Sequence, residues 1–225
     1  PALSVGWRLP IAAVGVNRTA IFEPQARLAF IGGKDRTSII PNRDASDYRI
    51  DEANLFLLNR YQGKDYILPG TRADFGASVT TNDNFFGDVS GFLGVSRRLS
   101  GNTSSGLNTD QGDKYSDYVA NLTVNPANSL NLRWSGRLSS KDLNLNESKT
   151  SLSSALGTGS LSVTHNQLAK AYFASSDDDR EELSASYSQS LIGGWQFSAT
   201  QLWDLSYGKT IRKKSKAALS WNGGV

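Results

Sequence analysis

The single histidine, His165, is the residue of this chain best suited to acid–base chemistry. Ser160 and Ser162 lie close before it, and a serine beside a histidine can act as an activated nucleophile. No nucleophile-elbow motif surrounds either serine, and no acidic residue stands where it would orient the imidazole. We therefore expect no catalytic residue and no enzymatic activity.

Two charged clusters offer other chemistry. Asp177-Asp178-Asp179 could hold a divalent cation, but the run lacks the spaced ligands of a calcium loop. We interpret it as a solvated loop tip and expect no metal and no cofactor. The densest basic cluster has two open interpretations, a phosphate-binding patch near an outer rim or a solvated strand end, the commoner origin of such runs; its members are Arg212, Lys213, Lys214 and Lys216.

Bulk properties exclude several classes of protein. The 225 residues carry a net charge of only +3, with acidic and basic residues interspersed, which argues against a nucleic-acid partner. Cysteine is absent, so there is no disulfide framework, thiol nucleophile or cysteine metal site. The sequence contains no run of about eighteen apolar residues, so it predicts no membrane-spanning helix.

Alternation with a period of two dominates the chain and predicts an all-β protein. Leu130, Leu132 and Trp134 alternate with polar residues, and the five tryptophans all fall on apolar faces. The strand predicted at residues 160–172 alternates least regularly, and a bulge near His165 to Gln167 is required to reconcile its two halves. We predict about eleven strands, at residues 3–9, 23–32, 71–80, 85–97, 117–125, 129–139, 148–156, 160–172, 181–190, 195–207 and 212–222.

Short and long connections alternate between these strands, as in transmembrane barrels. Several strands reach about ten residues, enough for a tilted strand to cross the hydrocarbon. The polar faces carry serine, asparagine, threonine, glycine and glutamine rather than the lysine and glutamate that coat a soluble sandwich. The pattern favours an antiparallel transmembrane β-barrel. The odd strand count predicts that residues 1–225 are one segment of a larger barrel domain.

An ordered series of motifs lies ahead of and within the third predicted strand. Asn54-Leu55-Phe56 is followed by Asn59-Arg60-Tyr61-x-Gly63-x-Asp65 and then by Gly70-Thr71-Arg72-x-x-x-Gly76. Ile40-Pro41-Asn42-x-Asp44 and Asp51 precede them. The series resembles the signature of the LptD family, the outer-membrane proteins that assemble lipopolysaccharide. The matching positions are Pro41, Asn42, Asp44, Asp51, Asn54, Leu55, Phe56, Asn59, Arg60, Gly63, Asp65, Gly70, Arg72 and Gly76.

The resemblance implies a translocon in the Gram-negative outer membrane that inserts lipopolysaccharide into the outer leaflet without covalent chemistry. It implies four kinds of partner: lipopolysaccharide, outer-membrane lipid, an LptE-like plug lipoprotein in the lumen, and periplasmic bridge proteins. The bridge proteins would dock through an N-terminal jellyroll that is absent from these residues. The alternative is a general porin or importer barrel, for which strand alternation alone would suffice.

Strand parity predicts that Arg72, Asp74, Arg133 and Arg137 face the lumen. There they could contact the plug or transiting sugar and phosphate, or pair with one another to line a wet wall. The link from Gly33 to Pro69 exceeds ordinary loop length. Its apolar residues 55–58 predict a segment that folds back into or over the lumen, with a short strand possible there.

Overall fold

The structure is a computed structural model of the whole chain. It describes residues 1–33, 50–60, 69–83, 87–101, 114–127, 130–169, 179–206 and 212–221. Several residues singled out by the sequence lie outside these ranges and stay predictions: Pro41, Asn42, Asp44, Gly63, Asp65, Asp177 and Asp178.

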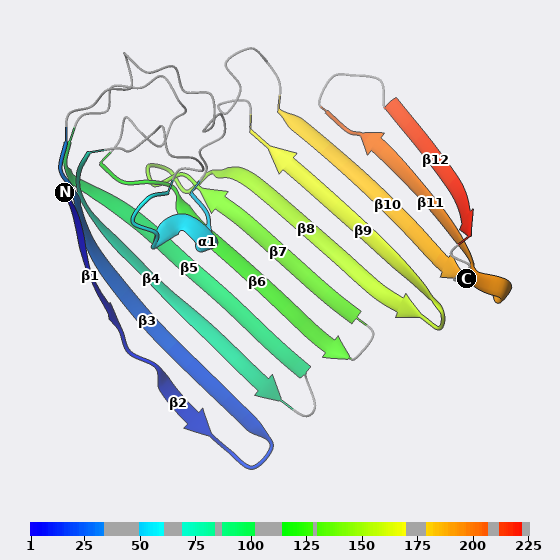
Figure 1. Cartoon of the computed structure of the whole chain (residues 1–225), viewed down its shortest axis with the longest axis horizontal. Helices are drawn as coiled ribbons and strands as arrows, with labels where there is room; N and C mark the ends of the chain where they lie inside the picture. The colour runs from blue at the N-terminus through cyan, green and yellow to red at the C-terminus, as the bar shows by residue number, and fades with distance from the viewer. Residues whose placement is uncertain are drawn as a thin grey trace. The chain divides into compact units, whose positions relative to one another are not determined.

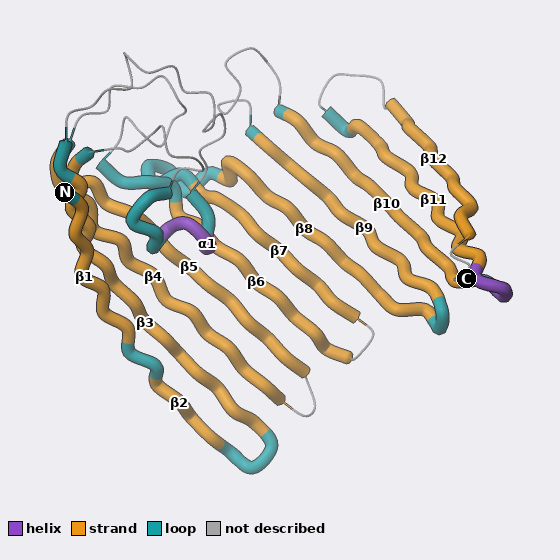
Figure 2. Tube along the Cα trace, viewed as in Figure 1, coloured by secondary structure: helices purple, strands orange, loops and turns teal. Residues whose placement is uncertain are grey.

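Strands make up most of the described chain, which confirms the all-β prediction (Figures 1 and 2). They follow the order β1-β3-β4-β5-β6-β7-β8-β9-β10-β11-β12, with β2 paired to β3 outside this path. The only α-helix in the described residues is α1, Glu52–Leu55. The strands are β1 Ala2–Arg8, β2 Ile11–Val14, β3 Arg18–Ile31, β4 Gly70–Asp83, β5 Gly87–Ser100, β6 Tyr118–Ala127, β7 Leu130–Leu138, β8 Leu145–Leu156, β9 Gly159–Leu168, β10 Arg180–Ser190, β11 Trp195–Asp204 and β12 Arg212–Trp221.

The sequence missed β2, so the described residues hold twelve strands where about eleven were predicted. β1 pairs with residues 25–31 of β3, and β2 pairs with residues 19–22 of the same strand. The interruption falls at Leu9-Pro10, where proline has no N–H to continue the ladder, and Leu9 still donates to the carbonyl of Pro24 at 3.1 Å. β2 escaped prediction because Ile11-Ala12-Ala13-Val14 is apolar throughout and does not alternate.

The chain divides into two compact units. The first comprises Pro1–Thr81, Ser90–Asn121 and Arg137–Asn144. Its small core consists of Ile50, Leu55, Phe92 and Val119, with Phe56 packed against it. Large apolar side chains on the opposite face of its strands are exposed, among them Leu3, Trp7, Phe30, Phe75 and Leu93.

The second unit comprises Asn82–Val89, Leu122–Gly136 and Leu145–Val225, and β8 to β12 pair in it as consecutive antiparallel neighbours. The predicted bulge near His165 to Gln167 is wrong. Residues Gly159 to Leu168 of β9 pair one-to-one with both β8 and β10. The apparent break in alternation arose because His165 and Gln167 occupy positions of the apolar face, while Leu168 occupies the last polar-face position of the strand.

Candidate functional site

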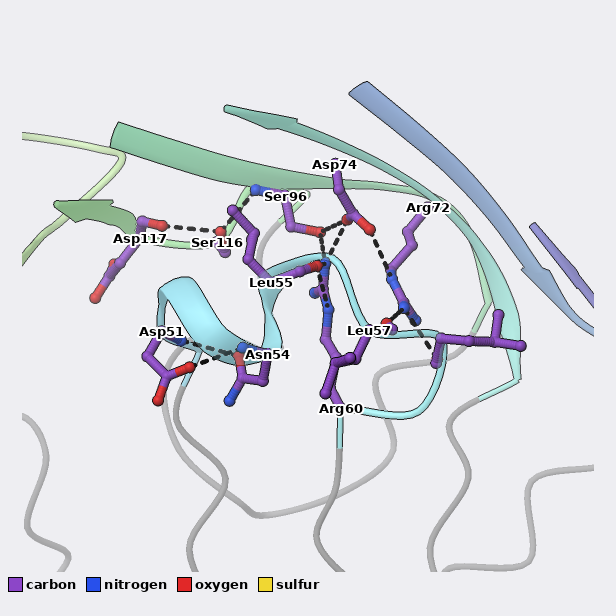
Figure 3. Close-up of polar contacts among 11 residues, drawn as sticks. Asp51, Asn54, Leu55, Leu57, Arg60, Arg72, Asp74, Ser96, Ser116 and Asp117 are labelled. Carbon is purple, nitrogen blue, oxygen red and sulfur yellow. Dashed lines mark hydrogen bonds and ion pairs between the residues drawn. The ribbon is translucent and has the colours of Figure 1, made fainter. Parts of the chain in front are cut away.

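The described part of the motif series ahead of β4 consists of residues 50–60, called here the docked segment (Figure 3). It begins with α1, which is closed by a capping box: the Asp51 carboxylate accepts from the Asn54 backbone N–H at 2.9 Å, and the Asn54 side-chain oxygen accepts from the Asp51 N–H at 2.9 Å. Such reciprocal bonds satisfy donors that a helix start leaves without partners. The short strand considered possible at residues 55–58 is therefore wrong, because α1 ends at Leu55 and a turn follows.

Leu55 and Phe56 fix the docked segment on the sheet through apolar contact. Leu55 has no exposed surface, and the Phe56 ring meets Phe92 edge-on with centroids 6.3 Å apart. Two glycines make room for them. A Cβ on Gly94 would lie 2.3 Å from Leu55 Cδ2, and a Cβ on Gly76 would lie 3.0 Å from Phe56 Cζ. Gly76 of the motif thus lies in close contact with Phe56 and Phe92, and a larger residue there would have to displace their rings.

Arg60 fixes the other end of the docked segment through a buried polar cluster (Figure 3). Its guanidinium donates to the Leu55 carbonyl from Nε at 3.1 Å and from Nη2 at 2.7 Å, which closes the segment on itself. Nη2 also donates to the Asp74 carboxylate and, at 3.0 Å, to the Ser96 hydroxyl. Ser96 Oγ donates to the same Asp74 oxygen at 2.7 Å.

Arg72 contacts the second oxygen of Asp74, with Nε 3.3 Å from Oδ2. Its Nη2 donates to the carbonyl of Leu57 and, at 3.0 Å, to that of Leu58. Asp74 has no exposed surface, so its charge depends on these donors. The cluster contains two arginines and a carboxylate surrounded by donors, and it holds the backbone of the docked segment in place.

The polar contacts continue from Ser96 to neighbouring strands of the first unit. The Ser96 N–H donates to Ser116 Oγ at 3.0 Å, and Ser116 Oγ donates to the Asp117 carbonyl at 2.9 Å. The Asp117 carboxylate pairs with Arg137, whose Nη2 lies 3.6 Å from Oδ2, and both side chains are largely buried. Of the four residues predicted to face the lumen, Arg72 and Asp74 pair with each other, whereas Arg137 pairs with Asp117, which is outside that set.

Arg133 differs from these three, since it is exposed on β7 in the second unit, next to the partly buried Trp134. Gly70 and Asn59 are the remaining motif residues of the described ranges. Gly70 opens β4 with φ of +142°, where a Cβ would lie 2.4 Å from the Ser100 carbonyl oxygen. Asn59 lies on the exposed surface just before Arg60.

Sequence reasoning did not identify the residues of the sheet against which the docked segment packs. Phe92, Gly94 and Ser96 occupy alternate positions of β5 and so share one face. Their spacing could have shown that they face the same way, but nothing local to β5 says that they receive Leu55 and Arg60. Val119 and Ser116 were missed for the same reason, since their partners are distant in sequence.

Alternation along a strand also divides two other groups of residues between opposite faces: His165 with its nearby serines, and the basic cluster. His165 Nε2 lies 2.8 Å from the Glu181 carboxylate, while Ser160 and Ser162 alternate onto the opposite face of β9. The basic cluster divides as well, because Lys213 lies on one face of β12 and Lys214 and Lys216 lie on the other. In the described ranges no group of three or more acidic, histidine or cysteine side chains is placed to hold a metal ion.

Comparison with known proteins assigns the architecture to a family. The family model described as LptD, LPS transport system D, matches residues 1–210, and no curated protein matches the chain. This family consists of outer-membrane β-barrel proteins of lipopolysaccharide transport and is not an enzyme family. Within the part of the chain that the structure describes, no helix is both long and apolar enough to span a membrane. The chain belongs to the LptD family of lipopolysaccharide transport proteins.

Proposed function

We propose that the full-length protein inserts lipopolysaccharide into the outer leaflet of the Gram-negative outer membrane as the barrel of a translocon. The observation that carries the proposal is the family match over residues 1–210. The alternating faces support it. The exposed face of Leu3, Trp7, Phe30 and Phe75 suits contact with lipid, and the face of Arg72 and Asp74 suits a hydrated lumen.

The docked segment lies on the polar face and is the part of this chain best placed to shape a lumen. Its fixed elements are Leu55, Arg60 and the backbone carbonyls of Leu57 and Leu58. We propose that it narrows the passage and leaves space for an LptE-like plug lipoprotein, with periplasmic bridge proteins delivering the substrate. Arg133, whose side chain is exposed, is then the residue of the predicted lumen set that is free to meet plug or substrate.

The first experiment depletes the full-length protein in its host and measures lipopolysaccharide at the cell surface. We expect surface lipopolysaccharide to fall while it accumulates at the inner membrane, and a plasmid copy of the full-length protein to restore it. Normal surface lipopolysaccharide with altered permeability to small solutes would overturn the proposal and favour the general porin or importer.

A further inference from the structure

The apolar face of β9–β12 in the second unit has a hollow of about 340 Å³, called here the wall groove. Tyr187, Ala199 and Ala217 lie in one row across β10, β11 and β12. Because paired residues point to the same face, the two alanines leave space beside the tyrosine ring. The side chains of this face that line the groove are Leu161, Ala185, Tyr187, Ala199, Gln201, Ser215 and Ala217.

The two polar side chains at the wall groove are engaged with each other and with the backbone. Gln201 Nε2 donates to the carbonyls of Leu202 and Lys214, each at 3.3 Å. Ser215 Oγ donates to Gln201 Oε1. The groove therefore presents mainly apolar surface, which suits a hydrocarbon chain better than a polar ligand.

A cation lies at one end of the wall groove. Lys213 is exposed and stands directly opposite Trp203 in the register of β11 and β12. Ser215, at the edge of the groove, is the next residue of the same face, about 7 Å along the strand. On the described apolar face of β8–β12 the one carboxylate is that of Glu181, and His165 Nε2 lies 2.8 Å from it. The ammonium group of Lys213 is thus placed to meet an anion beside an apolar groove.

Tryptophans mark both ends of this face, as they do where a barrel wall meets the two surfaces of a membrane. Trp195 and Trp221 are paired and exposed next to the turn Ile192–Gly194, and Trp203 lies toward the other end of β11. Eight positions separate Trp195 from Trp203, which at about 3.3 Å a residue and a tilt of about 40° gives about 20 Å. The apolar band of a barrel is about 25 Å tall, so Lys213 lies near the depth of lipid headgroups.

We propose that the wall groove binds one phosphorylated membrane lipid, with an acyl chain in the groove and the phosphate at Lys213. The flexible stem of a lysine lets its ammonium reach the membrane surface while its methylenes stay on apolar surface. The cation complements the phosphate, and the hollow complements the chain. The inference rests on the proposed function in one respect, the bilayer that covers this face.

Native mass spectrometry of the purified full-length protein tests the phosphate contact. The two probes are phosphatidylglycerol and an uncharged diacylglycerol with the same acyl chains. We expect Lys213→Gln to lower the occupancy of phosphatidylglycerol about three- to five-fold and to leave that of diacylglycerol unchanged. Lys213→Arg should retain both. Lys214→Gln, on the opposite face of β12, is the matched control.

A second variant tests the groove itself. Ala217→Leu places a larger side chain in the hollow, so the occupancy of both lipids should fall. Ala218→Leu makes the same change on the opposite face of β12 and should leave both unchanged. Heat-modifiable migration in detergent shows whether each variant has folded. An unchanged occupancy in Lys213→Gln or Ala217→Leu, or an equal loss in its control, would overturn the proposal.

A photo-crosslinking residue at Ala217 in the host envelope identifies the occupant. Capture of a lipid supports the proposal, and capture of a protein instead of a lipid contradicts it. The outcomes also separate this inference from the proposed function. If depletion abolishes surface lipopolysaccharide but lipid binding does not depend on Lys213, the inference is wrong and the proposed function stands. If depletion leaves surface lipopolysaccharide normal, the proposed function fails, whereas lipid binding that depends on Lys213 still supports the groove.

Discussion

The two carboxylate oxygens of Asp74 hold the buried polar cluster of the site together. It has no exposed surface, and it accepts from Arg60 and Ser96 at one oxygen and from Arg72 at the other. A buried ion pair adds little stability compared with a well-packed apolar pair, but losing one partner leaves a buried charge without compensation. The cluster therefore acts as a fixed attachment for the docked segment, and each of its members is sensitive to substitution.

Replacing Arg60 with methionine should detach the docked segment. We expect a loss of about 3–5 kcal/mol, because the Asp74 charge stays buried after its main partner is removed. Amide exchange of residues 50–60 in the purified full-length protein measures the opening. Leu57→Ala is the control, since the Leu57 side chain is half exposed. Adding Asp74→Asn to the Arg60 variant should recover part of the loss; no recovery would contradict the buried-charge explanation.

Gly94→Ala tests the packing beneath Leu55. The added methyl would lie 2.3 Å from Leu55 Cδ2 and 2.7 Å from Phe92 Cζ. Overpacking of this kind costs about 1–3 kcal/mol, so protease cleavage within residues 50–60 should become faster. Gly6→Ala is the matched strand control, because its nearest contact would be the Ala26 carbonyl oxygen at an ordinary 3.8 Å. Similar protease resistance in both variants would argue against the contact.

At the scale of elements, the connections fall into short turns and long links that alternate along the chain, as the sequence predicted. The turn between β8 and β9 holds Gly157 with φ of +61°, a conformation that glycine adopts readily. The link from β3 to β4 contains α1 and the docked segment. Turns were therefore predictable from local sequence, whereas the placement of residues 50–60 depends on their contacts with β4 and β5.

The link between β7 and β8 has a pH-sensitive element at Asp142. Hydrogen bonds from the Ser139 side chain and from the Asn144 backbone N–H, at 3.3 Å from Oδ1, lower the pKa of the Asp142 carboxyl. Because the pKa of Asp142 is lower in the folded link than in an unfolded chain, the ionised carboxylate stabilises the link at pH values above the ordinary pKa of aspartate. This stabilisation is lost as the pH falls from the ordinary pKa through the lower pKa of the folded state. The protection factors of residues 139–144 in amide exchange, which are corrected for the intrinsic pH dependence of exchange, should fall in acid, and Asp142→Asn should remove this fall.

At the scale of the molecule, the two faces of the strands suit different surroundings, because one face is apolar and the other is polar. In the second unit Leu152, Leu161, Leu219, Trp195 and Trp221 are exposed on one face. The other face carries polar residues such as Ser162, Ser186 and Thr200. Exposed apolar surface on this scale indicates contact with another apolar phase. The LptD family is an outer-membrane family, so the proposed function assigns the lipid bilayer to this face.

A paired substitution on β9 tests this assignment. Leu161→Arg places a charge on the apolar face, where a lipid-facing arginine costs from about 1 kcal/mol near the interface to about 2–4 kcal/mol at the bilayer midplane. Ser160→Arg places the same side chain on the opposite, polar face of β9, one residue away. We expect Leu161→Arg to lower the temperature at which the full-length barrel loses its heat-modifiable migration in detergent, and Ser160→Arg to change it little. Equal effects would contradict the assignment of the faces.

The sequence by itself determined the strands, their alternating faces and the family. Period-two alternation and turn residues are local properties, so eleven of the twelve strands were predictable, and β2 was not because it does not alternate. The motif series likewise indicated Arg60, Arg72 and Gly76 before their contacts were visible. Parity also indicated Asp74 and Arg137 as residues of polar strand faces, and in the structure both are buried in ion pairs.

Tertiary structure decided what those residues contact. Arg60 meets Ser96 across 36 positions of sequence, and Asn121 meets Glu52 of α1 across 69. No local pattern encodes such pairs, because the strands between them set which side chains meet. The choice of a capped helical turn at Glu52–Leu55 over a strand was decided in the same way, since burial of Leu55 against Phe92 and Val119 requires the assembled sheet.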